Sequence, residues 1–158
     1  EEAIDKVAEK LNNDYSNEDT PVFLSVLNGS FMFTASLMGR LKFNCEISFV
    51  KLASYTGTES SGCINKLIGL SDRIKGRKVV IIEDIVDSGN TIEELVKLLN
   101  EMGVEDIKIC TLFLKPKAYK KDIPIDYPAM EIGNEFIVGF GLDYDQLGRQ
   151  YKDIYIID

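Results

Sequence analysis

The stretch from Val79 to Thr91, VVIIEDIVDSGNT, constrains the fold of this chain more than any other segment. Four β-branched residues predict a buried strand, and two adjacent carboxylates, Glu83 and Asp84, follow it directly. A third carboxylate, Asp87, comes three residues later, before a small polar loop that opens onto an amphipathic segment. A strand that passes through such a loop into a helix favours a phosphorylated, hydroxyl-rich ligand, because carboxylates bind sugar hydroxyls or a metal and loop amides bind phosphate.

Strand-like and helical patterns alternate along the chain, which predicts an α/β protein with a mainly parallel central sheet flanked by helices. Helices are expected at residues 2–15, 31–41 and 92–102, and strands at residues 21–27, 45–52, 78–83, 107–114, 136–140 and 153–157. Thr91 and Glu94 offer a capping box for the third helix, and prolines indicate an irregular connection over residues 116–128. No repeat or linker divides the chain, so residues 1–158 are expected to form one domain with its ligand site at the carboxyl ends of the strands.

The composition argues against several classes of function. The 158 residues are 45% hydrophobic and 28% charged, as in ordinary globular proteins, and no apolar run approaches the roughly 20 residues of a membrane span. The net charge of −8 argues against a nucleic-acid-binding protein. The absence of histidine excludes Ser-His-Asp and Cys-His nucleophiles and histidine zinc sites. Cys45, Cys63 and Cys110 are odd in number and widely spaced, which predicts reduced thiols and a cytoplasmic location.

The segment from Glu83 to Thr91 resembles the phosphoribosyl-pyrophosphate motif of the type I phosphoribosyltransferases. The resemblance implies that Glu83 and Asp84 meet the ribose hydroxyls, directly or through magnesium, and that the loop after them wraps the 5′-phosphate. Asp87 is then expected near purine N7 as a general base, and Gly89 lets the backbone approach the phosphate because it has no Cβ. The phosphoribosyl-binding residues that the resemblance implies are Glu83, Asp84, Asp87, Ser88, Gly89, Asn90 and Thr91.

Resemblance to the 6-oxopurine branch of this family extends to two later stretches, LFLKP and EFIVGFGLDY. In the first stretch, Lys115 is expected to donate to the 6-oxo group of hypoxanthine or guanine, which selects against adenine. In the second stretch, Phe136 is expected to stack on the base and the backbone of Ile137 to bond its polar edge. Asp143, near the end of the second stretch, is expected close to the pyrophosphate magnesium.

The pyrophosphate loop of the family matches Leu27, Asn28 and Gly29. In the family, the peptide bond before the second of these residues is often cis. Many relatives carry lysine or arginine where this chain has Asn28, so the loop is expected to meet pyrophosphate through its amides rather than through a direct charged contact. Arg149 matches a basic residue that approaches the pyrophosphate.

Two further parts complete the fold that the resemblance implies. Residues of about 115–158 are expected to form a small C-terminal purine-binding hood. Ser54 and Tyr55 match the Ser-Tyr pair of a mobile lid, expected over about residues 53–66. Such a lid closes over the reaction centre and protects it from water.

The implied enzyme is a purine-salvage transferase that moves phosphoribosyl from 5-phosphoribosyl 1-pyrophosphate to N9 of a 6-oxopurine. Its implied cofactor is Mg²⁺, held by Glu83, Asp84 and Asp143. The implied assembly is a homodimer or homotetramer, without nucleic-acid or membrane partners. Three alternatives stay open: a sister transferase for another base, a regulator that senses phosphoribosyl pyrophosphate, and a phospho-acceptor receiver domain.

Overall fold

The computed structural model of the chain describes residues 1–52 and 67–158. The helices are α1 (Glu2–Asp14), α2 (Phe31–Met38) and α3 (Asn90–Glu101), with a 3-10 turn, η1 (Asp72–Ile74). The strands are β1 (Val22–Val26), β2 (Glu46–Leu52), β3 (Leu67–Ile68), β4 (Lys78–Val86), β5 (Asp106–Leu114), β6 (Tyr127–Glu131), β7 (Phe136–Val138) and β8 (Tyr155–Ile157). The predicted lid, with Ser54 and Tyr55, lies outside the described residues. Across residues 1–52 and 67–158, every helix is too short or too polar to cross a membrane.

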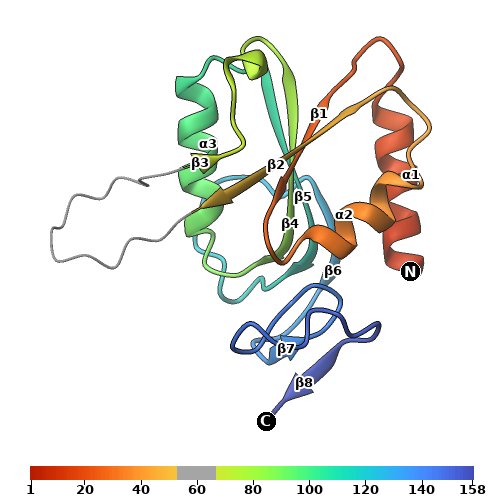
Figure 1. Cartoon of the computed structure of the whole chain (residues 1–158), viewed down its shortest axis with the longest axis vertical. Helices are drawn as coiled ribbons and strands as arrows, with labels where there is room; N and C mark the ends of the chain where they lie inside the picture. The colour runs from red at the N-terminus through yellow and green to blue at the C-terminus, as the bar shows by residue number, and fades with distance from the viewer. Residues whose placement is uncertain (53–66) are drawn as a thin grey trace, which may run out of the picture.

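The main sheet has six strands in the order β3-β2-β1-β4-β5-β6 (Figure 1). Strands β2, β1, β4, β5 and β6 run parallel, whereas the short β3 pairs antiparallel with β2. The chain leaves β1 through α2 toward one edge of the sheet, and it leaves β4 through α3 toward the other edge. The loops after β1 and β4 therefore lie side by side at the carboxyl ends of the strands, where open α/β sheets bind ligands. The predicted α/β fold with a mainly parallel sheet is confirmed.

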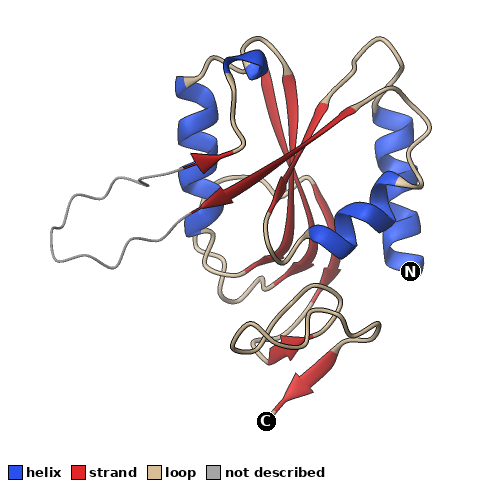
Figure 2. Ribbon diagram, viewed as in Figure 1, coloured by secondary structure: helices blue, strands red, loops and turns tan. Residues whose placement is uncertain are grey.

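Helices cover both faces of this sheet. Figure 2 shows α1 and α2 on one side of the sheet and α3 on the other. Successive side chains of β1 pack alternately on the two faces of the sheet. Phe23 belongs to the apolar cluster with α1 and α2, and Leu24 belongs to the cluster with α3. All five residues of β1 are buried, so the strand is apolar throughout except for Ser25.

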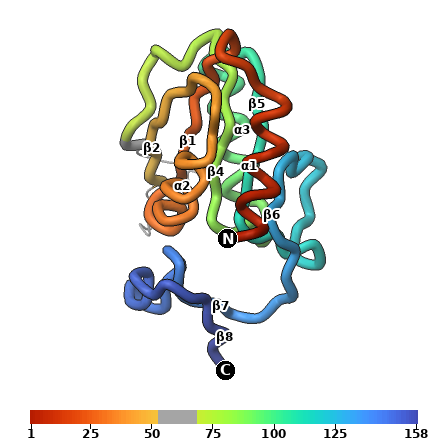
Figure 3. Tube along the Cα trace, turned by 90° about the vertical axis from the view of Figure 1, so that its right-hand side faces the viewer, coloured from red at the N-terminus to blue at the C-terminus, as the bar shows by residue number. Residues whose placement is uncertain are grey.

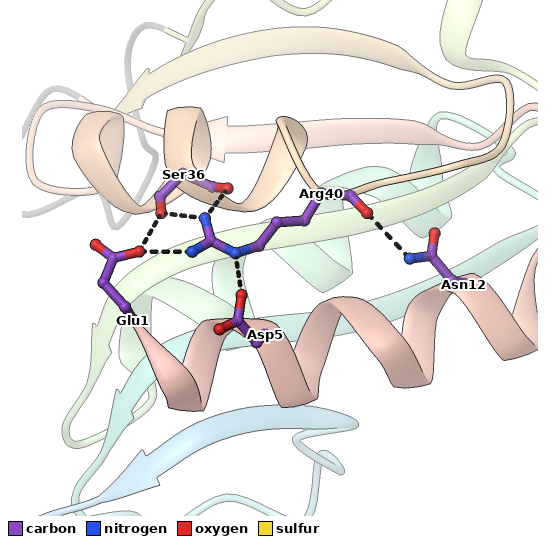
Figure 4. Close-up of polar contacts among 5 residues, drawn as sticks. All are labelled: Glu1, Asp5, Asn12, Ser36 and Arg40. Atoms are coloured by element: carbon purple, nitrogen blue, oxygen red, sulfur yellow. Dashed lines mark hydrogen bonds and ion pairs between the residues drawn. The ribbon is translucent and has the colours of Figure 1, made fainter.

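Arg40, just after α2, ties that helix to α1 (Figure 4). Its guanidinium donates to Asp5 Oδ1 (2.5 Å), to Glu1 Oε2 (2.6 Å) and to the carbonyl of Ser36 (2.7 Å). The Asn12 side chain donates in turn to the Arg40 carbonyl (3.0 Å). A network of this kind holds two helices in register better than isolated surface ion pairs do. Since α2 directly follows the loop after β1, the hydrogen bonds of Arg40 also fix where that loop ends.

The predicted capping box and the predicted irregular connection were wrong. Helix α3 begins at Asn90 behind Gly89, which is left-handed (φ 88°), and its start has no side-chain cap, so Thr91 forms no capping box. The connection between residues 116 and 128 is not irregular to its end, because β6 begins at Tyr127 and contains Pro128. β6 is the edge strand of the sheet, and an edge is where a strand tolerates proline.

Candidate active site

The loop after β4 forms a small pocket at the start of α3. The pocket measures about 90 Å³ and is lined by Glu83 and residues 85–92. Gly89 is buried there, and a Cβ at its left-handed position would lie 2.5 Å from the ring of Tyr119. The first amides of a helix have no partner within it, so a pocket with this exposed backbone suits a phosphate group.

The two adjacent acids lie inside β4, which continues to Val86 rather than ending at Glu83 as predicted. Neighbouring strand residues point to opposite faces, so Glu83 lines the pocket on the α3 side while Asp84 meets the loop that leads to α2. Glu83 is only 5% exposed, and its burial, followed by the charge of Asp84, raises the pKa of its carboxyl well above the usual value. The two acids can therefore serve different parts of one ligand.

Asp84 is in close contact with the loop after β1. A Cβ on Gly29 would lie 2.6 Å from Asp84 Cγ and closer still to Oδ2, so the contact requires glycine. The N–H of Ile85 donates to Asp84 Oδ1 (2.9 Å) and fixes the carboxylate from the other side. Burial raises the pKa of Asp84, and this backbone hydrogen bond opposes the shift. In the same loop, the bond between Leu27 and Asn28 is cis, as the resemblance implies.

Two hood residues, Asp143 and Arg149, meet at the same point. Arg149 Nη2 lies 3.0 Å from Asp143 Oδ1, and Nη1 donates to the carbonyl of Gly141 (2.8 Å). Gly141 packs directly on the backbone of Gly29, since a Cβ on Gly141 would lie 3.3 Å from Gly29 C and closer to its O. Arg149 lowers and Asp143 raises the pKa of Asp84, so the hood charges act on the sheet acid.

Lys115 and Asp87 lie together because they follow neighbouring parallel strands that pair Val86 with Leu114. Lys115 is 8% exposed, and its Nζ lies 3.4 Å from Asp87 Oδ2. Its backbone N–H donates to the carbonyl of Val86 (3.0 Å), which fixes the start of its turn. A nearly buried cation and an exposed carboxylate thus stand side by side at the rim of the pocket after β4.

The hood itself is the two-stranded sheet of β7 and β8. It lies at the end of the molecule toward which the arrows of β4, β5 and β6 point in Figure 1, and Figure 3 shows it at the same end from another side. Phe136 is 51% exposed and packs edge-to-face with Tyr144, at a centroid distance of 5.9 Å. Ile137 pairs with Ile156 across this two-stranded sheet. Over residues 1–52 and 67–158, no hydrogen bond or ion pair joins Phe136 or Ile137 to the other predicted site residues.

A family model described as "Phosphoribosyl transferase domain" matches residues 1–145. The chain belongs to the phosphoribosyltransferase family. The hypoxanthine-guanine phosphoribosyltransferase of Streptococcus pyogenes serotype M3 is 43% identical over 153 residues, which cover 96% of this chain and 84% of that protein. The enzyme of the same name from Streptococcus pneumoniae strain R6 is 38% identical over 157 residues, which cover 99% of this chain and 87% of that one. A crystal structure of a hypoxanthine-guanine phosphoribosyltransferase from Bacillus anthracis matches with a TM-score of 0.85 and 34% identity, over 99% of this chain and 92% of that one.

The magnesium ligands predicted for this phosphoribosyltransferase are all carboxylates, the donors that Mg²⁺ prefers. Asp143 lies 3.0 Å from the guanidinium of Arg149, whose charge also acts on the pKa of Asp84, and Asp84 contacts Gly29 of the predicted pyrophosphate loop. In the part of the chain that the structure describes, no three acids or cysteines are placed to hold a metal by themselves. Magnesium usually binds through one or two carboxylates and the phosphates of a substrate, so the site fits an ion that arrives with its substrate.

Sequence reasoning missed two groups of residues around the phosphoribosyltransferase site. Ser25, Ser30 and Thr34 form a buried hydroxyl network beneath the pyrophosphate loop. Tyr119 and Lys121 pack against Gly89, behind the loop after β4. A lone serine inside the apolar run PVFLSVL was a signal for the first group, because a buried hydroxyl needs a partner. Nothing local marks the second group.

Proposed function

We propose that this phosphoribosyltransferase transfers the phosphoribosyl group of 5-phosphoribosyl 1-pyrophosphate to N9 of hypoxanthine and of guanine, and releases pyrophosphate. The observation that carries the proposal is the 3.4 Å pair of Lys115 Nζ and Asp87 Oδ2 at the rim of the phosphate pocket. A 6-oxopurine presents its O6 acceptor beside N7, which carries a proton in one tautomer, so a cation next to a carboxylate matches this edge. Adenine presents an amino donor there and would face the ammonium group of Lys115. The names of the streptococcal relatives support the same substrates.

In the proposed mechanism, the chain mainly positions and neutralises its substrates. The amides of residues 88–91 hold the 5′-phosphate, and Glu83 and Asp84 take the ribose hydroxyls. The pyrophosphate lies against the amides of the loop after β1 and near Arg149. The base lies against the ring of Phe136, with the backbone of Ile137 at its polar edge.

The proposed reaction breaks the bond between C1 of the ribose and the pyrophosphate oxygen, and the oxygen leaves with the electron pair. N9 forms the new bond from the opposite ring face, and the N7 proton passes to Asp87. Magnesium, held by Asp84 and Asp143 together with the phosphates of the substrate, would supply positive charge to the leaving pyrophosphate, whereas Glu83 lies on the other face of β4.

Nucleotide formation tests the proposal, with hypoxanthine, guanine, xanthine and adenine assayed in parallel in the presence of magnesium. We expect turnover with hypoxanthine and guanine and none with adenine. The variant Asp87→Ala should lose about 10²-fold in kcat if it provides general-base catalysis. Tight binding of phosphoribosyl pyrophosphate without turnover of any base would identify a regulator instead, and turnover of another base alone would identify a sister transferase.

We propose that the chain assembles into a homodimer, the basic unit also of a homotetramer. The support is three exposed apolar side chains, Phe31, Ile47 and Phe49, which are 42%, 43% and 43% exposed. Ile47 and Phe49 point to the face of β2 opposite to the buried Val50, which places them on the α2 side with Phe31. Light scattering after size exclusion should give twice the chain mass or more, and Phe49→Lys should reduce it to that of one chain.

A further inference from the structure

The pyrophosphate loop has no charged side chain of its own, since Asn28 stands at its tip. The N–H of Leu27 is already used, because it donates to the carbonyl of Val50 (2.8 Å). Within the described residues, the amides of Asn28, Gly29 and Ser30 donate to no other group. Under the proposed function these amides meet the pyrophosphate, so affinity depends on how well the loop is held in shape.

Three buried hydroxyls lie directly beneath this loop. The Ser25 hydroxyl is 2.6 Å from that of Ser30 and 2.7 Å from that of Thr34. The Ser30 hydroxyl is 2.5 Å from the carbonyl of Val26. Ser25 and Ser30 are fully buried and Thr34 is 3% exposed, so water cannot replace these bonds.

The hydrogen bonds of this network can run in only one direction. A carbonyl oxygen only accepts, so Ser30 must donate its proton to Val26. Ser30 then has only lone pairs left for Ser25, so Ser25 donates to Ser30. Ser25 has now used its own proton, so Thr34 donates to Ser25. The order is Thr34 to Ser25 to Ser30 to the Val26 carbonyl, with Ser25 as the obligatory link.

The network joins the two ends of the loop, since Val26 is the last residue of β1 and Ser30 precedes α2. The opposite side of the loop is held by Asp84 and Gly141, both in close contact with Gly29. The loop is thus held between the hydroxyl network on one side and Asp84 and Gly141 on the other. Ser25 is the one polar side chain of β1, so the hydroxyl network depends on it.

We infer that Ser25 is a positioning residue for the pyrophosphate part of the substrate, a role that rests on the proposed function. Ser25 touches no substrate and acts through the Val26 and Ser30 ends of the loop. Removing its hydroxyl leaves Ser30 bonded to Val26 but without the donor that orients it, and leaves the Thr34 hydroxyl without its acceptor. The consequence falls on pyrophosphate and phosphoribosyl pyrophosphate, not on the purine.

The test compares Ser25→Ala with Thr34→Val and Thr34→Ser. We expect Ser25→Ala to raise the KM for phosphoribosyl pyrophosphate, and for pyrophosphate in the reverse reaction, by roughly tenfold, the effect of one to two lost buried hydrogen bonds. The KM for hypoxanthine should change less than twofold. Thr34→Val removes only the first donor and should have a smaller effect in the same direction, while Thr34→Ser keeps the hydroxyl and should restore wild-type values.

Equal increases in KM for purine and for both phosphorylated ligands would overturn the inference and make the network merely structural, as would a lower Tm with unchanged KM values. If Ser25→Ala does not fold, Thr34→Val decides by the same criteria. Calorimetric titration with magnesium pyrophosphate gives a readout without turnover, and unchanged affinity in Thr34→Val would also overturn the inference. A wild-type chain without turnover contradicts the proposed function, whereas active wild type with unaffected variants contradicts only the role of Ser25.

Discussion

Replacing Gly29 with alanine puts a methyl group where the carboxylate of Asp84 now lies. The added Cβ would be 2.6 Å from Asp84 Cγ, whereas carbon atoms need about 3.5 Å, so one of the two groups must move by about 1 Å. The loop cannot retreat freely, because Gly141 packs on the Gly29 backbone from the hood side. Asp84 is the group with freedom to move, at the expense of its hydrogen bond from the Ile85 amide.

The size of the effect follows from what Asp84 is proposed to do. A misplacement of about 1 Å at a reacting centre costs about 10²-fold in rate, so Gly29→Ala should lose about 10²-fold in kcat/KM for phosphoribosyl pyrophosphate. Overpacking a tight contact also destabilises a protein by about 1–3 kcal/mol, which urea unfolding would measure. The loss of activity should therefore far exceed what partial unfolding explains.

The assay is steady-state nucleotide formation at saturating hypoxanthine and magnesium, with phosphoribosyl pyrophosphate varied. Gly39→Ala is the matched control, because Gly39 has a helical φ of −63° and its nearest neighbour to a new Cβ, the Ala35 carbonyl, is 3.7 Å away. This control should keep wild-type kinetics and gain up to about 1 kcal/mol in stability. A Gly29→Ala variant with wild-type kcat/KM would show that the position of Asp84 does not matter for the reaction.

Three further predictions concern the charges around the site. Lys115→Gln should raise the KM for hypoxanthine at least tenfold, because a hydrogen bond to a charged group is worth about 1.5–3 kcal/mol. The binding of phosphoribosyl pyrophosphate should stay intact. Equal losses for both ligands would make Lys115 structural. Burial raises the pKa of Glu83, so the folded chain binds the carboxyl proton of Glu83 more tightly than the unfolded chain does. The free energy of unfolding therefore falls as pH rises from the usual pKa of a carboxyl group through the raised pKa of Glu83. Glu83→Gln should therefore have a higher Tm than wild type at neutral pH without magnesium, and a lower Tm would contradict this sign. Lys121 Nζ lies 2.8 Å from Glu93 in the first turn of α3. Lys121→Gln leaves the charge of Glu93 unpaired near the proposed phosphate site, so it should raise the KM for phosphoribosyl pyrophosphate about two- to fivefold. Adding Glu93→Gln should restore the wild-type KM. If the double variant stays impaired, Lys121 acts on the phosphate directly.

The sheet and most helices could be predicted because their signals are local. Burial on both faces gives β1 and β4 their apolar runs, and α3 shows its apolar positions at helical spacing. The limits of the elements were harder. β4 continues through Glu83 and Asp84 because pairing with β5 extends the strand, and polar residues alone do not reveal such pairing. β6 was missed because Pro128 indicates a turn unless the strand is known to lie at an edge.

The residues of the site could be named from their resemblance to a family, but their contacts could not. The close approach of Gly29 to Asp84 joins a loop to a strand residue 55 positions away, and no local pattern encodes it. The hydroxyl order from Thr34 to Val26 likewise follows from three-dimensional placement and the counting of protons. Physical rules explain these contacts once the fold is known, because the switch between β1 and β4 brings the two loops together.

The contact between Gly141 and Gly29 has a thermodynamic consequence for the release of products. One backbone wall separates the hood, where the nucleotide base is proposed to lie, from the loop proposed for pyrophosphate. A ligand that displaces this contact from one side would alter the affinity for a ligand on the other side, and by reciprocity the two would change each other's affinity by the same factor. A substitution that shifts this glycine pair would therefore change the binding of the second product in the presence of the first, and not only the binding of each alone.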